Sequence, residues 1–329
     1  MTGANGFIGS HLCAELVRRG HAVKAVVQPG TGLENLDGIH VELARADLRD
    51  VPSLHRAVQG AEVVFHLAAY VSDYGPRQTF DEINVRGTER LVEAAIAAGA
   101  RRLLFMSSLA VHAYRGHPAG DEETPRDQEV FEYGRSKRRG EEILERAWAS
   151  GRIETVIVRP GLFPFGPRDR AGFARIAAAL EGGRFAIVNG GRAVICTAYV
   201  ENLAEGVALA GEHPRAAGRI YVLSDGRRVT WRQVLEAIAQ ALRKPCSFTD
   251  FPSSIAYPAA VLWERLSGVV LPGRDPMLTR YRVAVAARDL FFDAARARRD
   301  LGWQPRVGFE DALERSVQWY RSSRSRTAA

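Results

Sequence analysis

The chain has 329 residues, 46% of them hydrophobic and 25% charged, as in an ordinary globular protein with room for one large or two moderate domains. Its 45 basic and 38 acidic residues give a net charge of +7, but the arginines are dispersed and no known nucleic-acid-reading module is recognisable, so we expect no nucleic-acid partner. Three scattered cysteines exclude a disulfide framework and a zinc site, and without a charged-then-apolar leader we expect a cytoplasmic protein.

The first motif is the glycine loop from Thr2 to Gly9, which runs into an apolar-periodic helix predicted over residues 7–19. Glycines let a backbone turn tightly and approach a pyrophosphate, which then rests on the amides of the helix N-terminus. Only Met1 and Thr2 precede Gly3, so the strand that should feed this loop is absent. We expect that strand, the centre of the predicted sheet, to be encoded upstream of Met1.

Strands and helices then alternate through the first half of the chain. The predicted strands are 22–28, 39–43, 62–67, 101–107 and 153–159, and the other predicted helices are 51–59, 78–99 and 133–150. This alternation predicts an α/β fold with a doubly wound parallel sheet. Glycines and prolines break the pattern after Gly161, which indicates a smaller C-terminal lobe. We predict a dinucleotide-binding domain over 1–165 that also receives about 199–223, and an interleaved substrate lobe over 166–329.

Three side chains in the first half suggest chemistry. Ser107 and Ser108 end a buried strand, where a doubly wound sheet meets its ligands. Tyr133 and Lys137 are four residues apart on a predicted helix and therefore share one face. Lysine is rare in this chain, because 42 of the 45 basic residues are arginine. An ammonium can donate to a ribose hydroxyl and lower the pKa of a neighbouring tyrosine, although the pair alone could also arise by chance on a solvated helix.

Together, these motifs resemble the extended short-chain dehydrogenase/reductase family over nearly the whole chain. The matching segments are Thr2–Gly9, Asp47-Leu48, His66–Ala69, Asn84–Thr88, Ser107-Ser108, Tyr133–Lys137 and Arg159–Gly161. The resemblance implies a Rossmann fold and a nicotinamide cofactor. It also implies that Ser108 orients the substrate oxygen, that Tyr133 is the general acid/base, and that Lys137 holds ribose and lowers the pKa of Tyr133.

The same resemblance supplies a set of cofactor-binding candidates. Gln28 lies at the end of the predicted strand 22–28, and Asp47 and Leu48 would lie near adenine. The other candidates are Gly3, Gly6, Phe7, Ile8 and Gly9 in the loop, and Leu67, Ala68, Ala69 and Pro160. A carboxylate at position 28 would favour NAD(H) and a basic side chain NADP(H). Gln28 is neither, so we expect NAD(H) or NADP(H), and the missing carboxylate slightly favours NADP(H).

A second resemblance concerns the substrate. The segments Ala69–Pro76, Pro276–Tyr281 and Phe292–Pro305 are similar to the 3β-hydroxysteroid dehydrogenase branch of the family and its bacterial relatives. Asp73, Tyr74, Phe163 and Tyr199 are the substrate-binding candidates. Residues 254–271 are strongly apolar but interrupted by charges, which is consistent with a lobe-packing helix, a pocket wall or peripheral membrane contact. A homodimer is a further expectation, and His112 and His117 are expected to be solvated loop residues rather than metal ligands.

We therefore expect an NAD(P)-dependent oxidoreductase that moves a hydride between nicotinamide and a secondary alcohol or ketone. The substrate is expected to be a small apolar molecule of the 3β-hydroxysteroid or 3-oxo acid type. One alternative is a nucleotide-sugar epimerase or dehydratase that retains NAD, for which Arg168, Asn189 and Arg192 could bind a diphosphate. The other is a regulator that senses a dinucleotide without turnover, which would not need Ser108, Tyr133 and Lys137 together.

Overall fold

The computed structural model describes residues 1–270, 276 and 278–328, with the backbone alone for 267–270 and 326–328. A parallel sheet in the order β2-β1-β3-β4-β6-β10 forms the N-terminal half, with Thr2 bridging β1 and β3. This confirms the predicted doubly wound α/β fold. The sheet strands are β1 (Lys24–Val27), β2 (Glu42–Arg45), β3 (Val63–His66), β4 (Arg102–Met106), β6 (Glu154–Pro160) and β10 (Arg219–Leu223).

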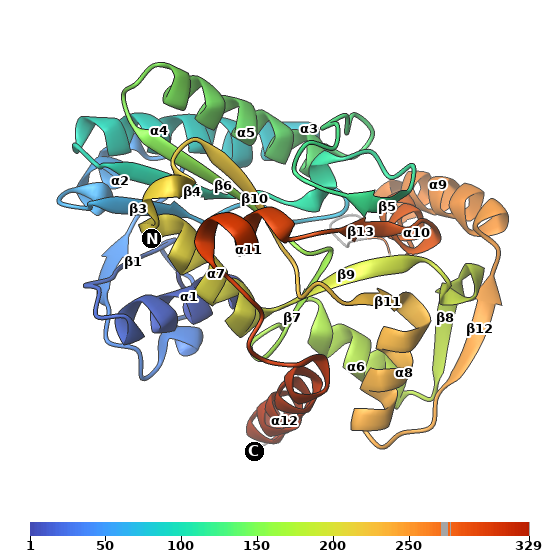
Figure 1. Cartoon of the computed structure of the whole chain (residues 1–329). Coiled ribbons are helices and arrows are strands. Elements are labelled where there is room, and N and C mark those ends of the chain that lie inside the picture. The colour runs from blue at the N-terminus through green and yellow to red at the C-terminus, as the bar shows by residue number, and fades with distance from the viewer. Residues whose placement is uncertain (271–275, 277, 329) are drawn as a thin grey trace.

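Helices cover both faces of this sheet (Figure 1). One face packs against α1 (Phe7–Arg18), α7 (Val200–Glu212) and α11 (Ala295–Leu301), and the other packs against α2 (Val51–Val58), α4 (Gly87–Ala97) and α5 (Glu132–Ala149). The short α3 (Arg77–Phe80) and a π-helical turn (Asp81–Arg86) lead into α4. Apolar side chains such as Leu12, Leu203 and Leu144 are fully buried against the strands. Sequence periodicity predicted α1, α2 and α5 to within about one residue and the stretch from α3 to α4 to within about two, whereas α7 and α11 were not predicted as helices.

The centre of the sheet is bridged by the first two residues. The amide of Thr2 donates to the carbonyl of Phe65 at 2.9 Å, and the amide of Val26 donates to the carbonyl of Met1 at 2.8 Å. Thr2 thus joins β1 to β3 through isolated bridges, and among the described residues the first regular element is α1. A strand encoded upstream of Met1 remains a prediction.

The second lobe is built around a mixed sheet in the order β11-β9-β13-β5, with β7 beside β9 and a separate β8–β12 pair. Its strands are β5 (His117–Gly120), β7 (Phe163–Phe165), β8 (Arg184–Val188), β9 (Val194–Tyr199), β11 (Arg228–Thr230), β12 (Ser247–Phe251) and β13 (Leu290–Phe292). Its helices are α6 (Phe173–Glu181), α8 (Trp231–Ala241), α9 (Ser253–Val270), α10 (Arg280–Ala287) and α12 (Phe309–Ala328). β5 comes from the first half of the chain and β10 from the second, so the lobes are interleaved; the boundary at residue 165 remains a prediction.

The motif around Trp303 has an architectural role. Gly302 ends α11 with a φ of 64°, and the buried Trp303 indole donates to the carbonyl of Asn202 at 3.1 Å. The Asn202 side-chain oxygen accepts from the amides of Arg306 and Val307. These contacts fix the segment that follows α11 to the start of α7. As a separate finding, no described helix is long and apolar enough to cross a membrane.

His66 at the end of β3 is a buried, neutral histidine. Its ring nitrogens lie 2.9 Å from the Thr2 hydroxyl and 3.0 Å from the Thr88 hydroxyl, and its side chain is 1% exposed. Burial lowers the pKa of His66 to about 3, and the charge of Lys137 adds to this effect. The residue beneath the glycine loop is therefore one whose protonation in acid would destabilise the fold.

We expect His66 to make the protein less stable in mild acid. Between pH 6.5 and pH 3 the unfolded chain binds a proton at this residue that the folded chain does not, so stability falls as pH falls. From pH 7 to pH 5 the loss from this residue should be about 2 kcal/mol. Urea unfolding at both pH values should give a smaller pH difference for His66→Gln than for the wild type. The control His40→Gln, at an exposed site, should keep the wild-type difference; an unchanged difference in His66→Gln would contradict the expectation.

Candidate active site

The glycine loop is shaped for close approach of a ligand. Gly3 has a φ of +67°, and a Cβ there would lie 2.8 Å from the backbone nitrogen of Ala68. A Cβ at Gly9 would lie 2.0 Å from the carbonyl oxygen of Gly3. α1 starts after Gly6 without a side-chain cap, which leaves its first amides available to an anion. These features fit the pyrophosphate of a dinucleotide.

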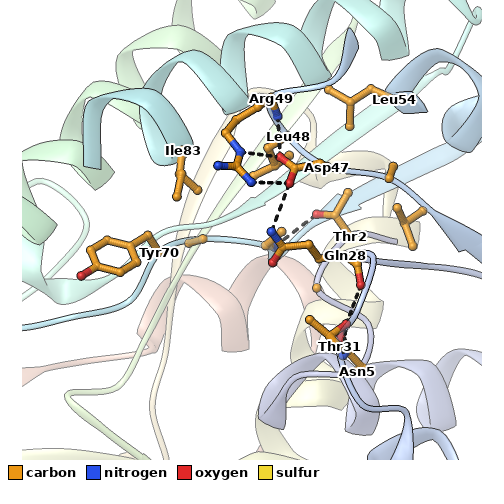
Figure 2. A pocket seen from close by; sticks show the side chains of 15 residues that line it. Thr2, Asn5, Gln28, Thr31, Asp47, Leu48, Arg49, Leu54, Tyr70 and Ile83 are labelled. Atoms are coloured by element: carbon orange, nitrogen blue, oxygen red, sulfur yellow. Dashed lines mark hydrogen bonds and ion pairs between the residues drawn. The ribbon is translucent and has the colours of Figure 1, made fainter. Parts of the chain in front are cut away.

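A cavity of about 260 Å³ adjoins this loop (Figure 2). It is bounded by the loop, the ends of β1 and β2 and the segment after β3. Its lining residues are Thr2, Gly3, Asn5, Val26, Gln28, Thr31, Ala46, Asp47, Leu48, Arg49, Leu54, Ala68, Ala69, Tyr70 and Ile83. An adenosine moiety would find apolar walls on several sides and polar groups at one end, as expected for a cofactor site.

The polar end is formed by Gln28, Asp47 and Arg49 (Figure 2). The Arg49 guanidinium donates two hydrogen bonds to the Asp47 carboxylate, at 2.9 and 2.7 Å, and the Gln28 amide donates a third at 3.1 Å. The Arg49 side chain beside Asp47 holds the pKa of that carboxyl well below its usual range. Because the pair is neutral overall, the pocket itself offers no net charge to a ribose or to a ribose phosphate.

The structure gathers only part of the predicted cofactor set in this cavity. Gly3, Gln28, Asp47, Leu48, Ala68 and Ala69 line it, whereas Gly6, Phe7, Ile8, Gly9, Leu67 and Pro160 do not. Gly6 to Gly9 lie at the start of α1, and Pro160 ends β6. Among the lining residues that the sequence interpretation missed, Asn5 donates to Thr31 at 3.0 Å, and Arg49 follows Asp47 by two residues. Both residues lie within or next to predicted motifs in the sequence, and this position could have indicated that they line the cofactor site.

Ser108, Tyr133 and Lys137 meet at the carboxyl end of β4. The Lys137 ammonium donates to the carbonyl of Met106 at 2.8 Å and lies 5.9 Å from the centre of the Tyr133 ring. The Ser108 side chain is close enough to hydrogen-bond with the Tyr133 phenol. The neighbouring Ser107 is buried, and its hydroxyl donates to Glu141 at 2.5 Å, so Ser108 is the serine on the side of Tyr133.

Close packing of α5 on β4 brings these groups together. A Cβ at Gly134 would lie 2.0 Å from the carbonyl oxygen of Ala110, and a Cβ at Gly140 would lie 2.6 Å from the Phe105 ring. Only glycine at both positions lets α5 lie this close to the strand and the turn that follows Ser108. The helix face that carries Tyr133 and Lys137 is thereby pressed against the site.

A buried ionic network braces the same elements from behind. Arg159 of β6 and Glu141 of α5 are both fully buried and form two hydrogen bonds, at 2.8 and 2.7 Å. The Arg126 guanidinium donates a third hydrogen bond to the Glu141 carboxylate, at 3.1 Å. Burial favours the protonated carboxyl, but Arg159 outweighs it and lowers the pKa of Glu141. Removing one partner alone would leave an uncompensated buried charge.

The pKa of Tyr133 is shifted in the direction opposite to the one that the resemblance implies. Burial raises the pKa of Tyr133 above its ordinary value, the nearby Tyr281 phenol adds to this, and only the hydrogen bond with Ser108 opposes it. Burial also lowers the pKa of Lys137 to about 7, against the raising effect of Glu141. Desolvation is therefore the dominant influence on both groups, and Tyr133 is a neutral proton donor.

The four substrate candidates fall into two groups. Asp73 accepts from the Thr279 hydroxyl at 3.0 Å and pairs with Arg282 at 2.6 Å, while the Tyr74 hydroxyl donates to the carbonyl of Glu264 at 3.3 Å. Both residues thus attach the loop after β3 to α9 and α10. Phe163 and Tyr199 instead belong to the core of the second lobe, where each packs within 5.6 Å of Phe165. Both side chains therefore have a packing role, and their assignment as substrate residues stays a prediction.

The histidine prediction also needs correction. His112 is fully buried, stacks on Phe292 with ring centres 4.7 Å apart, and contacts the carbonyl of Pro125 at 2.9 Å. His117 is half-buried beside the same phenylalanine. His112 is thus a core residue and His117 a partly exposed one. No group of three His, Cys, Asp or Glu side chains that could hold a metal lies within the described part of the chain.

The predicted apolar segment 254–271 forms most of α9. Ile255, Leu262, Trp263 and Leu266 are 40–62% exposed along it. Ala256 and Ala260 pack inward against Val283 of α10. Leu271 lies outside the described residues, and contact with a membrane stays a prediction.

The comparisons with known proteins agree with this geometry. A model of the NAD dependent epimerase/dehydratase family matches residues 1–224. The chain belongs to this family. The resemblance to extended short-chain dehydrogenase/reductases is thereby confirmed, and with it a Rossmann-type fold and membership of an NAD-dependent enzyme family.

Named relatives refine the position within the family. The chain is 31% identical to a 2-alkyl-3-oxoalkanoate reductase of Stenotrophomonas maltophilia, over 96% of this chain and 97% of the relative. It is also 31% identical to a 4-hydroxy-2-methyl-3-oxo-4-farnesyl-3,4-dihydroquinoline-1-oxide ketoreductase of Stigmatella aurantiaca, over 95% and 94%. The crystal structure of gox2253 aligns with a TM-score of 0.81 at 30% identity, over 98% and 97%. The chain is thus an enzyme of the family's oxidoreductase type, acting on CH–OH groups.

Proposed function

We propose that the protein interconverts a secondary alcohol and a ketone of an apolar small molecule, of the 3β-hydroxysteroid or 3-oxo acid type. The meeting of Ser108, Tyr133 and Lys137 at the end of β4, beside the glycine loop, is the observation that carries this proposal. The names of the reductases from Stenotrophomonas and Stigmatella, which specify oxo compounds with alkyl or farnesyl groups, support the apolar class.

Each side chain has a task that its environment suits. A nicotinamide cofactor, held by the glycine loop and the Gln28–Asp47–Arg49 pocket, would supply or accept the hydride. Tyr133 stays protonated, so it can transfer its phenolic proton to the oxygen of a ketone that is being reduced. Ser108 donates a hydrogen bond to the same oxygen as negative charge develops on it. Lys137, held by the carbonyl of Met106, is placed to bind ribose hydroxyls beside Tyr133.

The test is a cofactor-oxidation screen. Purified protein is mixed with NADPH or NADH and with ketosteroids, 3-oxo acids or nucleotide sugars, and the loss of absorbance at the nicotinamide band is followed. Net oxidation of cofactor with one of the apolar ketones is expected. Conversion of a nucleotide sugar without net cofactor oxidation would instead establish the epimerase or dehydratase alternative.

The epimerase alternative rests on the family description, which names epimerases and dehydratases. Its diphosphate candidates are less favourable in the folded chain. The Asn189 side chain is occupied by Ser253, with hydrogen bonds of 3.1 and 2.8 Å, and Arg192 is exposed. Of these three candidates, Arg168 is the one with a buried guanidinium nitrogen that has no hydrogen-bond partner within the described residues.

For the cofactor, NADP(H) is favoured over NAD(H) by a small margin, because no carboxylate occupies position 28. Gln28→Arg should strengthen NADP(H) binding by about 1–2 kcal/mol through a charge-assisted contact with the ribose phosphate. Gln28→Asp should shift the preference toward NAD(H), although its carboxylate would also repel Asp47. Binding titrations with both dinucleotides measure the ratio of affinities. If neither substitution changes that ratio, Gln28 does not lie beside the adenosine ribose.

A further inference from the structure

Three aromatic rings form a cluster next to Tyr133. Tyr114 follows the turn after Ser108, Phe131 precedes α5, and Tyr281 lies in the first turn of α10. The ring of Tyr281 meets the ring of Tyr114 edge-on at 5.5 Å and the ring of Phe131 edge-on at 5.4 Å. Residues more than 160 positions apart in the sequence thus build one wall beside the proton donor.

The wall carries hydroxyl groups that the proposed chemistry does not use. The Tyr114 hydroxyl is buried and makes no hydrogen bond of normal geometry within the described residues, and the polar group that it faces is the Tyr281 phenol. Leaving a buried hydroxyl unpaired costs free energy, so a group that supplies the partner would be favoured there. Burial raises the pKa values of both Tyr114 and Tyr281, and therefore both phenols remain neutral donors.

The Tyr281 phenol is held firmly in this position. The Thr279 hydroxyl caps α10 by accepting from the amide of Arg282 at 3.1 Å, and it donates to Asp73. The buried Glu264 of α9 accepts from the amide of Arg280 at 2.7 Å. Anchors on both sides of Tyr281 therefore fix its helical turn to α9 and to the loop after β3, which is the rigidity that a recognition group needs.

We propose that Tyr114 and Tyr281 bind a second oxygen-bearing group of the substrate, a carboxylate separated by one methylene carbon from the reacting carbon, so that the preferred substrate is a 3-oxo or 3-hydroxy acid. This inference rests on the proposed function. The Tyr133 and Ser108 hydroxyls bind the oxygen that reacts, and the neighbouring phenols donate to the carboxylate. A hydrogen bond from a neutral phenol to a carboxylate is charge-assisted and stronger than one to a neutral oxygen. A sterol alcohol without an acid group would leave the Tyr114 hydroxyl with only its contact to the Tyr281 phenol.

The experiment compares 3-hydroxydecanoate with 2-nonanol, its counterpart without the carboxylate, as substrates for oxidation with NAD⁺ or NADP⁺. The variants are Tyr281→Phe and Tyr114→Phe, which keep the rings and remove the hydroxyls. We expect each variant to lose about tenfold or more in kcat/KM for the acid and to change by less than about twofold for the alcohol. Tyr257→Phe on α9, outside this cluster, is the matched control and should change neither.

Equal losses on both substrates, or no loss on the acid, would overturn the proposal. Failure of the proposed function is recognised separately: the wild type then oxidises neither compound and also reduces none of the apolar ketones in the cofactor-oxidation screen. In that case calorimetric titration of 3-hydroxydecanoate into the protein with NADP⁺ or NAD⁺ decides the question. Weaker binding of the acid to Tyr281→Phe than to the wild type supports the carboxylate site, and identical binding, or none to either protein, overturns it.

Discussion

Tyr133→Phe should reduce turnover by a hundredfold or more, on the scale that follows the loss of a positioned acid/base. The phenylalanine ring keeps its packing beside Lys137 and lacks only the transferable proton, so affinity for the dinucleotide should stay nearly unchanged. Steady-state kinetics with the substrate found by the screen, together with cofactor titration, measures the two effects separately.

A loss of cofactor affinity as large as the loss of turnover would show that the tyrosine supports the fold of the site instead of donating a proton. Because burial raises the pKa of Tyr133, the wild type should show no titration of this phenol in kcat/KM for reduction anywhere below pH 10. If kcat/KM changed near pH 7 through titration of Tyr133, the charge of Lys137 would outweigh burial and lower the pKa of Tyr133.

Lys137→Arg should also lower turnover by about a hundredfold, with the fold intact. Arginine keeps the positive charge, but its wide planar fork cannot replace an ammonium that is buried against the carbonyl of Met106 and the Phe105 ring. Lys244→Arg, an exposed lysine on the second lobe, is the matched control and should leave turnover unchanged.

The same pair of variants has a signature in the pH profile. Burial lowers the pKa of Lys137 to about 7, so its charge is present below that pH and is lost above it. The kcat/KM profile of the wild type should change near pH 7, and the change should disappear in Lys137→Arg, whose guanidinium stays charged. If Lys137→Arg turned over at the wild-type rate, the rarity of lysine in this chain would reflect codon bias alone and would not indicate a functional role for Lys137.

Local patterns were sufficient to predict the first half of the fold. Strands such as β3 and β4 are continuous apolar runs, and α5 has a helical period, so chain order alone predicts a parallel sheet. β5 was missed because His117–Gly120 is short, contains a proline and becomes a strand only through pairing with β13. Its partner lies about 170 residues away, and no local signal in the sequence announces it.

The candidate site divides in the same way. Gly3, Ser108, Tyr133 and Lys137 follow from motif order, because the ends of parallel strands bring them together. The wall formed by Tyr114 and Tyr281 could not be predicted, since it depends on how α10 folds over the sheet. The direction in which the pKa of Tyr133 is shifted could not be predicted either. Sequence spacing places the phenol and the ammonium side by side, but it does not show how much hydration each group loses on burial.

The contacts of Asp73 with Thr279 and Arg282 connect positions 206 or more residues apart. Loop closure over such a length is entropically costly, and non-local contacts of this kind form late in folding. The nucleotide-binding sheet, with its short-range strand pairings, can assemble on its own first. The wall over the substrate would then be the last part to form and the first to open, so a nascent or partly unfolded chain would bind dinucleotide before it could select a substrate.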